Sequence, residues 1–306
     1  VVAGAGVLVA TLGFVADAVD GRWHSADAGW GESLSFTAEQ QFEGDFRILW
    51  VGDPAILPTD PFEIHNGVAY ALTVNGTGDA RALLRAPRQD ADAVVARSVE
   101  LALDGRTNRL GRLVAPMGVR YVAAPVRNGP GGPKGTPVAG LDTRLADQLD
   151  LAELGVESGV VLYENTAWFP ARGVAAEGAE VPTGPRAPIL AALRSDLAGQ
   201  VTPLGATPAG PGRIVDAQAF DDAWEATADG RTLRHDEAFG WANSWALPER
   251  GEVTLSFTDQ RATTLMIAGQ AVLWIVLAVV GWTGRRRRLR RCGILRGRCA
   301  AGRVCG

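Results

Sequence analysis

Phe46-Arg47-Ile48-Leu49-Trp50-Val51 is an almost uninterrupted apolar run, and a Gly-Asp-Pro turn sequence follows it at once. The stretch Val119 to Val126 (VRYVAAPV) has the same character. Continuous apolar runs of this length are typical of strands that are buried on both faces of a sheet, because half-exposed strands alternate apolar and polar residues. We therefore predict that the two segments lie side by side as central strands of one sheet, with Ile48, Leu49 and Val122 buried.

Two helices are expected to pack against this sheet. Residues 92–103 carry apolar side chains at helical spacing, and a glycine follows as a stop signal. A second helix is expected over residues 141–154, where Leu141, Leu145 and Leu149 recur on one face. Further strands are expected at Val68 to Val74 and at Val160 to Tyr163. Strands that alternate with helices predict a small α/β domain, which we assign to residues 20–175.

A change of pattern after residue 212 predicts a second domain. Short extended segments such as Val253 to Phe257 alternate there with turn sequences such as Asp229-Gly230. Many short strands with regular turns are typical of a β-sandwich, so we predict a small jelly-roll-like β-sandwich over residues 213–262. The Pro- and Gly-rich residues 176–212 are expected to form a linker region between the two domains.

The end of the chain predicts a membrane anchor. Thr264 to Trp282 contains no charged residue, and Arg285 to Arg291 follows with six arginines. A run of nineteen uncharged, mostly apolar residues matches the hydrocarbon core of a bilayer, and a dense basic flank stays in the cytoplasm. We therefore expect a transmembrane helix at residues 264–282 and a basic cytoplasmic tail at residues 283–306.

The beginning of the chain fits the same topology. Residues 1–15 carry no charge, and the first acidic residue is Asp17. We interpret residues 1–19 as the end of a longer transmembrane helix, and a secretory signal peptide is the alternative. Either reading places the bulk of the chain, about residues 20–262, outside the cytoplasm of a cell membrane.

Charge and cysteine usage limit the partners. Nine of the 30 basic residues lie after Gly284, so the preceding part carries 21 basic against 34 acidic residues. This acidic balance argues against a nucleic-acid partner, because phosphate binding needs clustered Lys and Arg, whereas the tail suits anionic membrane lipid. All three cysteines lie in the tail at a spacing that fits no zinc site, and we predict no metal and no cofactor.

One set of residues is a candidate ligand surface. Arg106, Arg109 and Arg112 form a regular cationic row, and guanidinium groups match the oxygens of phosphate or of an anionic glycan. Trp241 and Trp245 offer flat apolar faces on which a sugar ring can stack. The competing interpretation is that the arginines pair with local carboxylates while the tryptophans fill a core.

No catalytic residues are predicted. The histidines, His24, His65 and His235, are isolated in the sequence. Asp90-Ala91-Asp92 has the spacing of a metal-binding motif, but it enters a predicted helix, where acidic residues are favoured by the helix dipole.

Several longer strings carry a resemblance. They are Phe46 to Pro54 (FRILWVGDP), Gly105 to Leu113 (GRTNRLGRL), Ala115 to Val122 (APMGVRYV) and Tyr163 to Pro170 (YENTAWFP). In this order they resemble the C-terminal region of large actinobacterial membrane glycosyltransferases of family 2. The closing pattern, Trp224 with Asp229-Gly230, then Gly251 to Phe257 and a membrane helix, is similar to the end of YfhO-like membrane glycosyltransferases.

The resemblance implies a function without supplying a catalytic site. Catalysis in family 2 is carried by a cytoplasmic nucleotide-sugar domain with an Asp-x-Asp metal motif, and no part of this chain matches that domain. The expected function is therefore the non-catalytic extracytoplasmic part of a polytopic glycosyltransferase of cell-envelope polysaccharide synthesis. Its partners would be the lipid bilayer and a glycan or polyprenyl-linked sugar. A non-enzymatic envelope protein that binds glycan or a partner protein is the alternative.

Overall fold

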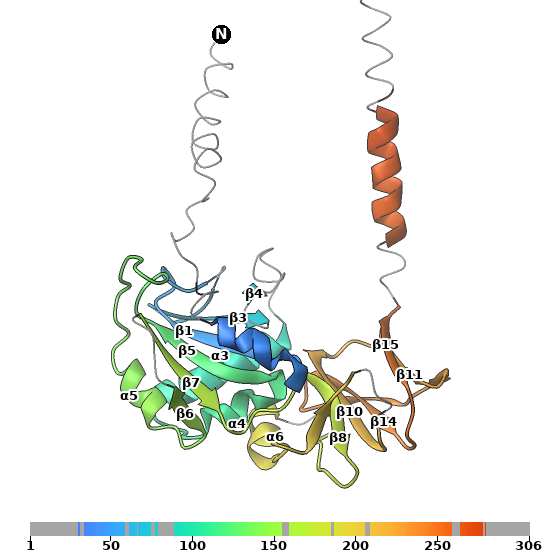
Figure 1. The fold of residues 1–306 in the computed structure, drawn as a ribbon, viewed down its shortest axis with the longest axis horizontal. Helices are drawn as coiled ribbons and strands as arrows, with labels where there is room; N and C mark the ends of the chain where they lie inside the picture. The colour runs from blue at the N-terminus through green and yellow to red at the C-terminus, as the bar shows by residue number, and fades with distance from the viewer. Residues whose placement is uncertain are drawn as a thin grey trace, which may run out of the picture. The chain divides into compact units, whose positions relative to one another are not determined.

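A computed structural model of the chain gives the fold. It describes residues 30, 34–58, 61–65, 67–74, 77–78, 89–154, 159–184, 187–205, 209–258, 264–277 and 279. Residues 1–255 form one compact unit and residues 256–306 form another. The first unit is built mostly from three β-sheets, with few helices (Figure 1).

The largest sheet has β1 (Arg47–Gly52) and β5 (Val119–Pro125) at its centre, and these two strands run parallel. The predicted pairing of the two apolar stretches is thus confirmed. The strand order is β2-β3-β1-β5-β7-β6, and β4 pairs with β3. The remaining strands are β2 (Phe62–His65), β3 (Val68–Val74), β4 (Thr77–Gly78), β6 (Leu151–Leu154) and β7 (Val160–Asn165).

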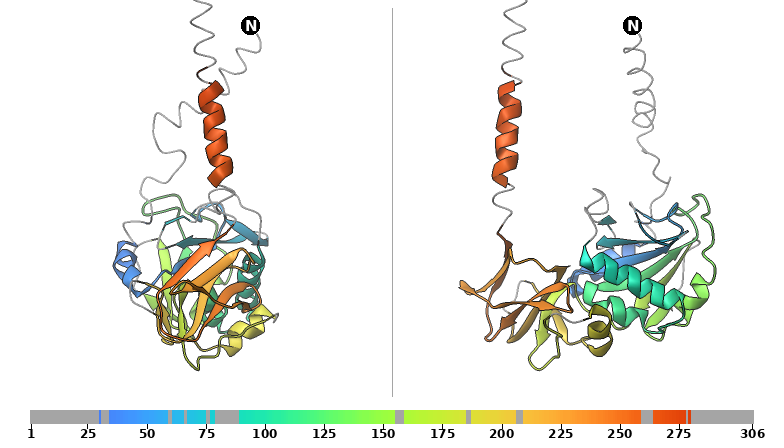
Figure 2. Two further views of the ribbon diagram at one scale, coloured as in Figure 1. Left: turned by 90° about the vertical axis from the view of Figure 1, so that its right-hand side faces the viewer. Right: turned by 180° about the vertical axis from the view of Figure 1, so that it is seen from behind.

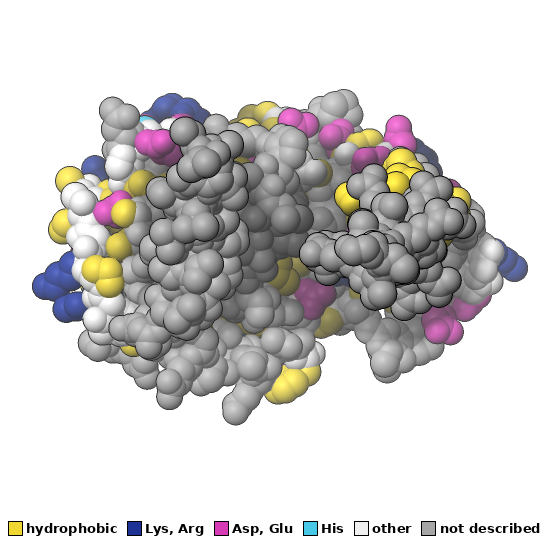
Figure 3. Space-filling view, turned by 90° about the horizontal axis from the view of Figure 1, so that it is seen from above, with side chains coloured by type: hydrophobic (Ala, Val, Ile, Leu, Met, Phe, Trp, Pro, Cys, Tyr) yellow, Lys and Arg dark blue, Asp and Glu magenta, His cyan; other side chains and the backbone are white. Residues whose placement is uncertain are grey.

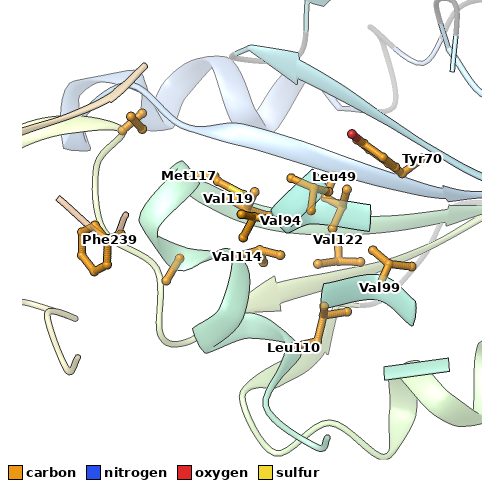
Figure 4. Packing of buried hydrophobic residues seen from close by; sticks show 14 of the residues in the cluster. Leu49, Tyr70, Val94, Val99, Leu110, Val114, Met117, Val119, Val122 and Phe239 are labelled. Atoms are coloured by element: carbon orange, nitrogen blue, oxygen red, sulfur yellow. The ribbon is translucent and has the colours of Figure 1, made fainter. Parts of the chain in front are cut away.

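Both faces of this sheet are covered, which explains its continuous apolar strands. On one face, α3 (Asp90–Leu103) and α4 (Leu110–Val114) pack against Leu49 and Val122, both fully buried (Figure 4). On the other face, Ile48 packs with residues near the 3-10 helix η1 (Ser35–Glu43). Figures 1 and 2 show η1 and α3 on opposite sides of the sheet. A short 3-10 helix, η2 (Ala115–Met117), leads into β5.

The predicted helix over residues 141–154 is wrong in its second half. The helix α5 spans only Leu141–Ala146, and residues 151–154 form β6 at the edge of the sheet. Leu141 and Leu145 are buried as expected, but Leu149 is 65 % exposed. The i, i+4 spacing of Leu149 continued the helical pattern by coincidence, because a turn separates it from α5.

The other two sheets form the β-rich part of the unit. One has the order β13-β14-β10-β8-β9 and the other the order β12-β11-β15. Apolar side chains of β10, β14 and β8, among them Ile214, Trp245 and Val174, share a cluster with residues of β11 and β15. The strands are β8 (Arg172–Ala176), β9 (Val201–Pro203), β10 (Gly212–Ala219), β11 (Trp224–Ala228), β12 (Arg231–Thr232), β13 (His235–Ala238), β14 (Ala242–Leu247) and β15 (Val253–Phe257).

Residues 176–212 are part of this architecture, which differs from the predicted linker. They include α6 (Pro188–Arg194) and β9, and β9 pairs with β8. In turn, β8 pairs with β10, so the β-rich part begins before residue 213. Pro188 begins α6, and Pro203 ends β9.

The predicted membrane segments are described only in part. Residues 1–19 lie outside the described residues. The described residues of 264–277 are helical with exposed side chains, within the span expected for the second membrane helix. In the described part of the chain, no helix combines the length and the apolar character needed to cross a membrane.

Candidate functional site

A pocket lies where the two central parallel strands end. Gly52 and Asp53, at the end of β1, and Pro125 and Val126, at the end of β5, line a cavity of about 340 Å³. Parallel strands that end side by side leave a crevice between their loops, and ligands of α/β proteins bind in such crevices. The volume falls in the range of small-ligand pockets, about 300–1,000 Å³.

The pocket combines an apolar surface with polar groups. Ile56, Ala124, Pro125, Val138 and Leu141 contribute the apolar surface. The remaining lining residues are Gly52, Asp53, Val126, Lys134, Gly135, Thr136, Pro137 and Asp142. Such a mixture suits a ligand with apolar faces and polar edges.

Asp53 organises the wall of the pocket. Its Oδ1 accepts the backbone N–H of Ala55 at 2.9 Å, and its Oδ2 accepts that of Thr136 at 2.6 Å. These backbone hydrogen bonds lower the pKa of the Asp53 carboxyl below its ordinary value, because they favour the ionised form. The carboxylate thereby fixes the loop after β5 to the turn after β1.

The loop after β5 is a closed hairpin that holds Lys134 at the pocket. Arg127 and Lys134 form a β-bridge, and Gly135 donates its N–H to the carbonyl of Val126 at 3.1 Å. The guanidinium group of Arg127 donates to the Gly132 carbonyl at 3.0 Å. The sequence patterns predicted no helix or strand for residues 127–140. The one available signal was Lys134, since it is the only lysine in the chain.

The structure does not gather the predicted arginine row into one surface. Arg106 lines a second cavity, of about 470 Å³, which neither Arg109 nor Arg112 lines. Arg109 is exposed. Arg112 forms an ion pair with Asp196 at 3.3 Å. Of the three arginines, Arg106 is therefore the one that lines a cavity described here.

The two predicted stacking tryptophans face the interior. Trp241 is 3 % exposed and Trp245 is fully buried, and they belong to different apolar clusters. The ring of Trp245 stacks on His235, with 4.7 Å between centroids and an angle of 9° between the rings. Neither tryptophan thus offers a face to a sugar, because both side chains are buried in the interior.

The histidines and the Asp-Ala-Asp string that the sequence analysis considered lie at the following places. His235 is 3.0 Å from Asn243 Oδ1 through its Nε2, and His65 lies on the edge strand β2. Asp92 accepts the backbone N–H of Gln89 at 2.7 Å, which caps the first turn of α3. This confirms the interpretation of the Asp-Ala-Asp string as a helix N-terminus. His24 lies outside the described residues.

Two buried carboxylates have perturbed proton affinity. Burial raises the pKa of the Asp216 carboxyl, and the Arg172 guanidinium, 3.4 Å away, opposes the shift. Burial also raises the pKa of the Asp150 carboxyl, against the effect of the N–H groups of Arg112 and Gly111. Asp150 lines none of the cavities described here, whereas Asp216 lines a small one of about 70 Å³ together with Asp45 and Arg172.

On the face drawn in Figure 3, the described acidic and basic side chains are scattered and do not form one large patch of either charge. Within the described residues, no group of three His, Cys, Asp or Glu side chains has the arrangement of a metal site. In the comparisons with known proteins, no family model, no curated protein and no solved structure matches this chain.

Proposed function

We propose that this chain is the non-catalytic, extracytoplasmic part of a polytopic membrane glycosyltransferase of cell-envelope polysaccharide synthesis. In this proposal it binds a glycan, either the acceptor or the sugar of a polyprenyl-linked intermediate. The observation that carries the binding role is the pocket at the carboxyl ends of β1 and β5, with its apolar surface and its polar groups Asp53, Lys134 and Asp142.

The chemistry of the pocket fits a sugar unit. A sugar ring has apolar C–H faces and hydroxyl groups around its edge. Leu141 and Val138 offer apolar surface to the faces, whereas Lys134 can donate to a hydroxyl and Asp142 can accept from one. Asp53 is already engaged by two backbone N–H groups, so it holds the wall in place for the ligand.

The membrane setting is supported by the sequence. The uncharged residues 264–282 are followed by six arginines within Arg285 to Arg291. A bilayer-spanning helix with a cytoplasmic basic flank has this pattern. The pocket would then face the compartment in which envelope polysaccharide is assembled.

The single lysine allows a direct test on the full chain. Acetylation of Lys134 by an amine-reactive ester is followed by mass spectrometry, with short neutral oligosaccharides of hexoses or pentoses present. We expect the oligosaccharides to slow the acetylation of Lys134 but not that of the N-terminal amine. The open-chain polyol sorbitol should not protect. Equal labelling with every oligosaccharide would overturn the proposal.

A matched pair of variants ties protection to the pocket. Asp142→Ala should raise the oligosaccharide concentration needed to protect Lys134 about tenfold, as expected when a hydrogen bond to a charged group is lost. Asp222→Ala removes an exposed carboxylate that does not line the pocket, and it should leave protection unchanged. The same loss in both variants would show that protection does not come from this pocket.

A further inference from the structure

A second cavity lies between the loop that follows α3 and the end of α5. Its volume is about 470 Å³. It is lined by Ala102, Gly105, Arg106, Thr107, Asn108, Arg144, Asp147 and Gln148. Residues of the first pocket do not line this cavity, so the two are separate places on the domain.

The guanidinium group of Arg144 lies against the backbone of Gly105. An ideal Cβ at Gly105 would be 2.6 Å from Arg144 Nη1 and 2.9 Å from its Cζ. Gly105 also has a φ of +68°, a conformation that favours glycine. The absence of a side chain at this turn is therefore what leaves room for the guanidinium group.

A buried amide holds the two walls of the cavity together. Gln148 is 4 % exposed, and its Oε1 accepts the backbone N–H of Leu110 at 2.8 Å. Its Nε2 donates to the carbonyl of Thr107 at 3.3 Å and to that of Arg144 at 2.8 Å. One side chain thus fixes the backbone beside Arg106 to the backbone of Arg144, so the cavity is a built feature of the fold.

The cavity has an excess of positive charge. Two arginines and one carboxylate, that of Asp147, line it. In the described part of the chain, neither Arg106 nor Arg144 forms an ion pair with a carboxylate, whereas the nearby Arg112 pairs with Asp196 at 3.3 Å. Guanidinium groups that lack a carboxylate partner are suited to bind the oxygens of an external anion.

We propose that this cavity binds a phosphate group, with Arg106 and Arg144 as the two ligands that carry the charge. The Thr107 hydroxyl and the Asn108 amide line the same cavity and can donate further hydrogen bonds. The phosphate can belong to a soluble phosphate ester or to a lipid headgroup, and both present the same oxygens. The proposal does not depend on a glycan in the first pocket.

The test uses the full chain labelled with ¹⁵N-arginine, reconstituted in nanodiscs of phosphatidylcholine. Inorganic phosphate is titrated, and the side-chain N–H signals of Arg106 and Arg144 are followed. We expect both signals to shift in a saturable way. Arg106→Ala and Arg144→Ala should each raise the Kd for phosphate about tenfold. Binding should weaken as salt is added, because the site is open to solvent.

The control variant is Arg109→Ala. It removes an exposed arginine of the same loop that does not line the cavity, so it should leave the Kd for phosphate unchanged. Replacing the nanodisc lipid with phosphatidylglycerol, with no added phosphate, distinguishes the two sources. Shifted signals in that lipid indicate a headgroup ligand, and shifts only with inorganic phosphate indicate a soluble one. Absence of any shift of the arginine signals would overturn the proposal. An equal loss of phosphate affinity in Arg109→Ala and Arg106→Ala would overturn it as well.

Discussion

The carboxylate of Asp150 accepts the backbone N–H of Gly111 at 3.0 Å, and its other oxygen accepts that of Arg112 at 2.7 Å. This places the carboxylate on the first turn of α4. Asn165 lies beside it and donates to the carbonyls of Gly111 at 2.9 Å and Val119 at 2.8 Å. The two side chains therefore join α4 to β5 and β7. Three of the strings that suggested a glycosyltransferase resemblance meet at this junction, which gives them a structural role.

Gly111 is the residue that allows this junction to form. A Cβ at this position would clash with Asn165 Oδ1 and would lie 2.8 Å from Asp150 Cγ. We expect Gly111→Ala to lower the free energy of unfolding by about 1–3 kcal/mol, the usual cost of overpacking a filled interior. Thermal unfolding of the purified chain measures this loss. Gly210→Ala adds the same methyl group where nothing lies within 4 Å, and it should not lower the midpoint.

Two leucines provide a matched test of the central sheet. Leu49 on β1 is fully buried, whereas Leu149 is 65 % exposed. Leu49→Ala should lower the free energy of unfolding by about 2–5 kcal/mol, since it leaves a cavity in the core. Leu149→Ala should change it by less than about 0.5 kcal/mol. Denaturant unfolding followed by circular dichroism compares the two. A large loss of unfolding free energy in Leu149→Ala would indicate that Leu149 is buried, as the longer predicted helix requires.

The central strands were predictable because their signal is local. Both faces of β1 are covered, so nearly every residue from Ile48 onward is apolar, and a short run of that kind with a turn sequence after it is typical of a buried strand. The helix over residues 141–154 was predicted too long for the opposite reason. Leu149 continues the spacing of Leu141 and Leu145, and periodicity alone does not register a turn between them.

The candidate pocket was not predictable from local patterns. Its wall depends on a hydrogen bond from the N–H of Thr136 to Asp53, two residues that are 83 positions apart. The arginine row failed for a related reason. Its spacing placed Arg106 with Arg109 and Arg112, whereas the cavity pairs Arg106, in the loop after α3, with Arg144 of α5. Contacts between distant segments decide both sites.

The buried Asp216 predicts a dependence of stability on pH. Burial raises the pKa of its carboxyl above the ordinary value of 3.8, with Arg172 and Arg47 acting against the shift and Asp45 with it. A group whose pKa is raised on folding stabilises the fold below its unfolded pKa, and this contribution is lost as pH rises through the folded pKa. Relative to Asp216→Asn, the wild-type chain should therefore lose stability as pH rises above about 4. The slope should not exceed about 1.4 kcal/mol per pH unit.

The measurement compares unfolding midpoints at a series of pH values. The unfolding midpoint of the wild type should fall relative to that of Asp216→Asn as pH rises. Asp222→Asn, at an exposed carboxylate, should keep the pH dependence of the wild type. A difference between the wild type and Asp216→Asn that stays constant over the whole series would contradict the assignment.

Native residues of the chain can report the proposed topology without any substitution. Lys134, the only lysine, lies in the domain that we place outside the cytoplasm, and all three cysteines lie in the basic tail that we place inside. In intact cells, a membrane-impermeant amine reagent should modify Lys134, because its side chain is exposed. A membrane-impermeant maleimide should leave Cys292, Cys299 and Cys305 unmodified until the cells are opened, because short arginine-rich flanks of a membrane helix are retained in the cytoplasm. Peptide mass spectrometry reads both reactions in one sample. Modification of the cysteines in intact cells, or of Lys134 only after lysis, would reverse the orientation and would remove the glycan pocket from the compartment in which the proposal needs it.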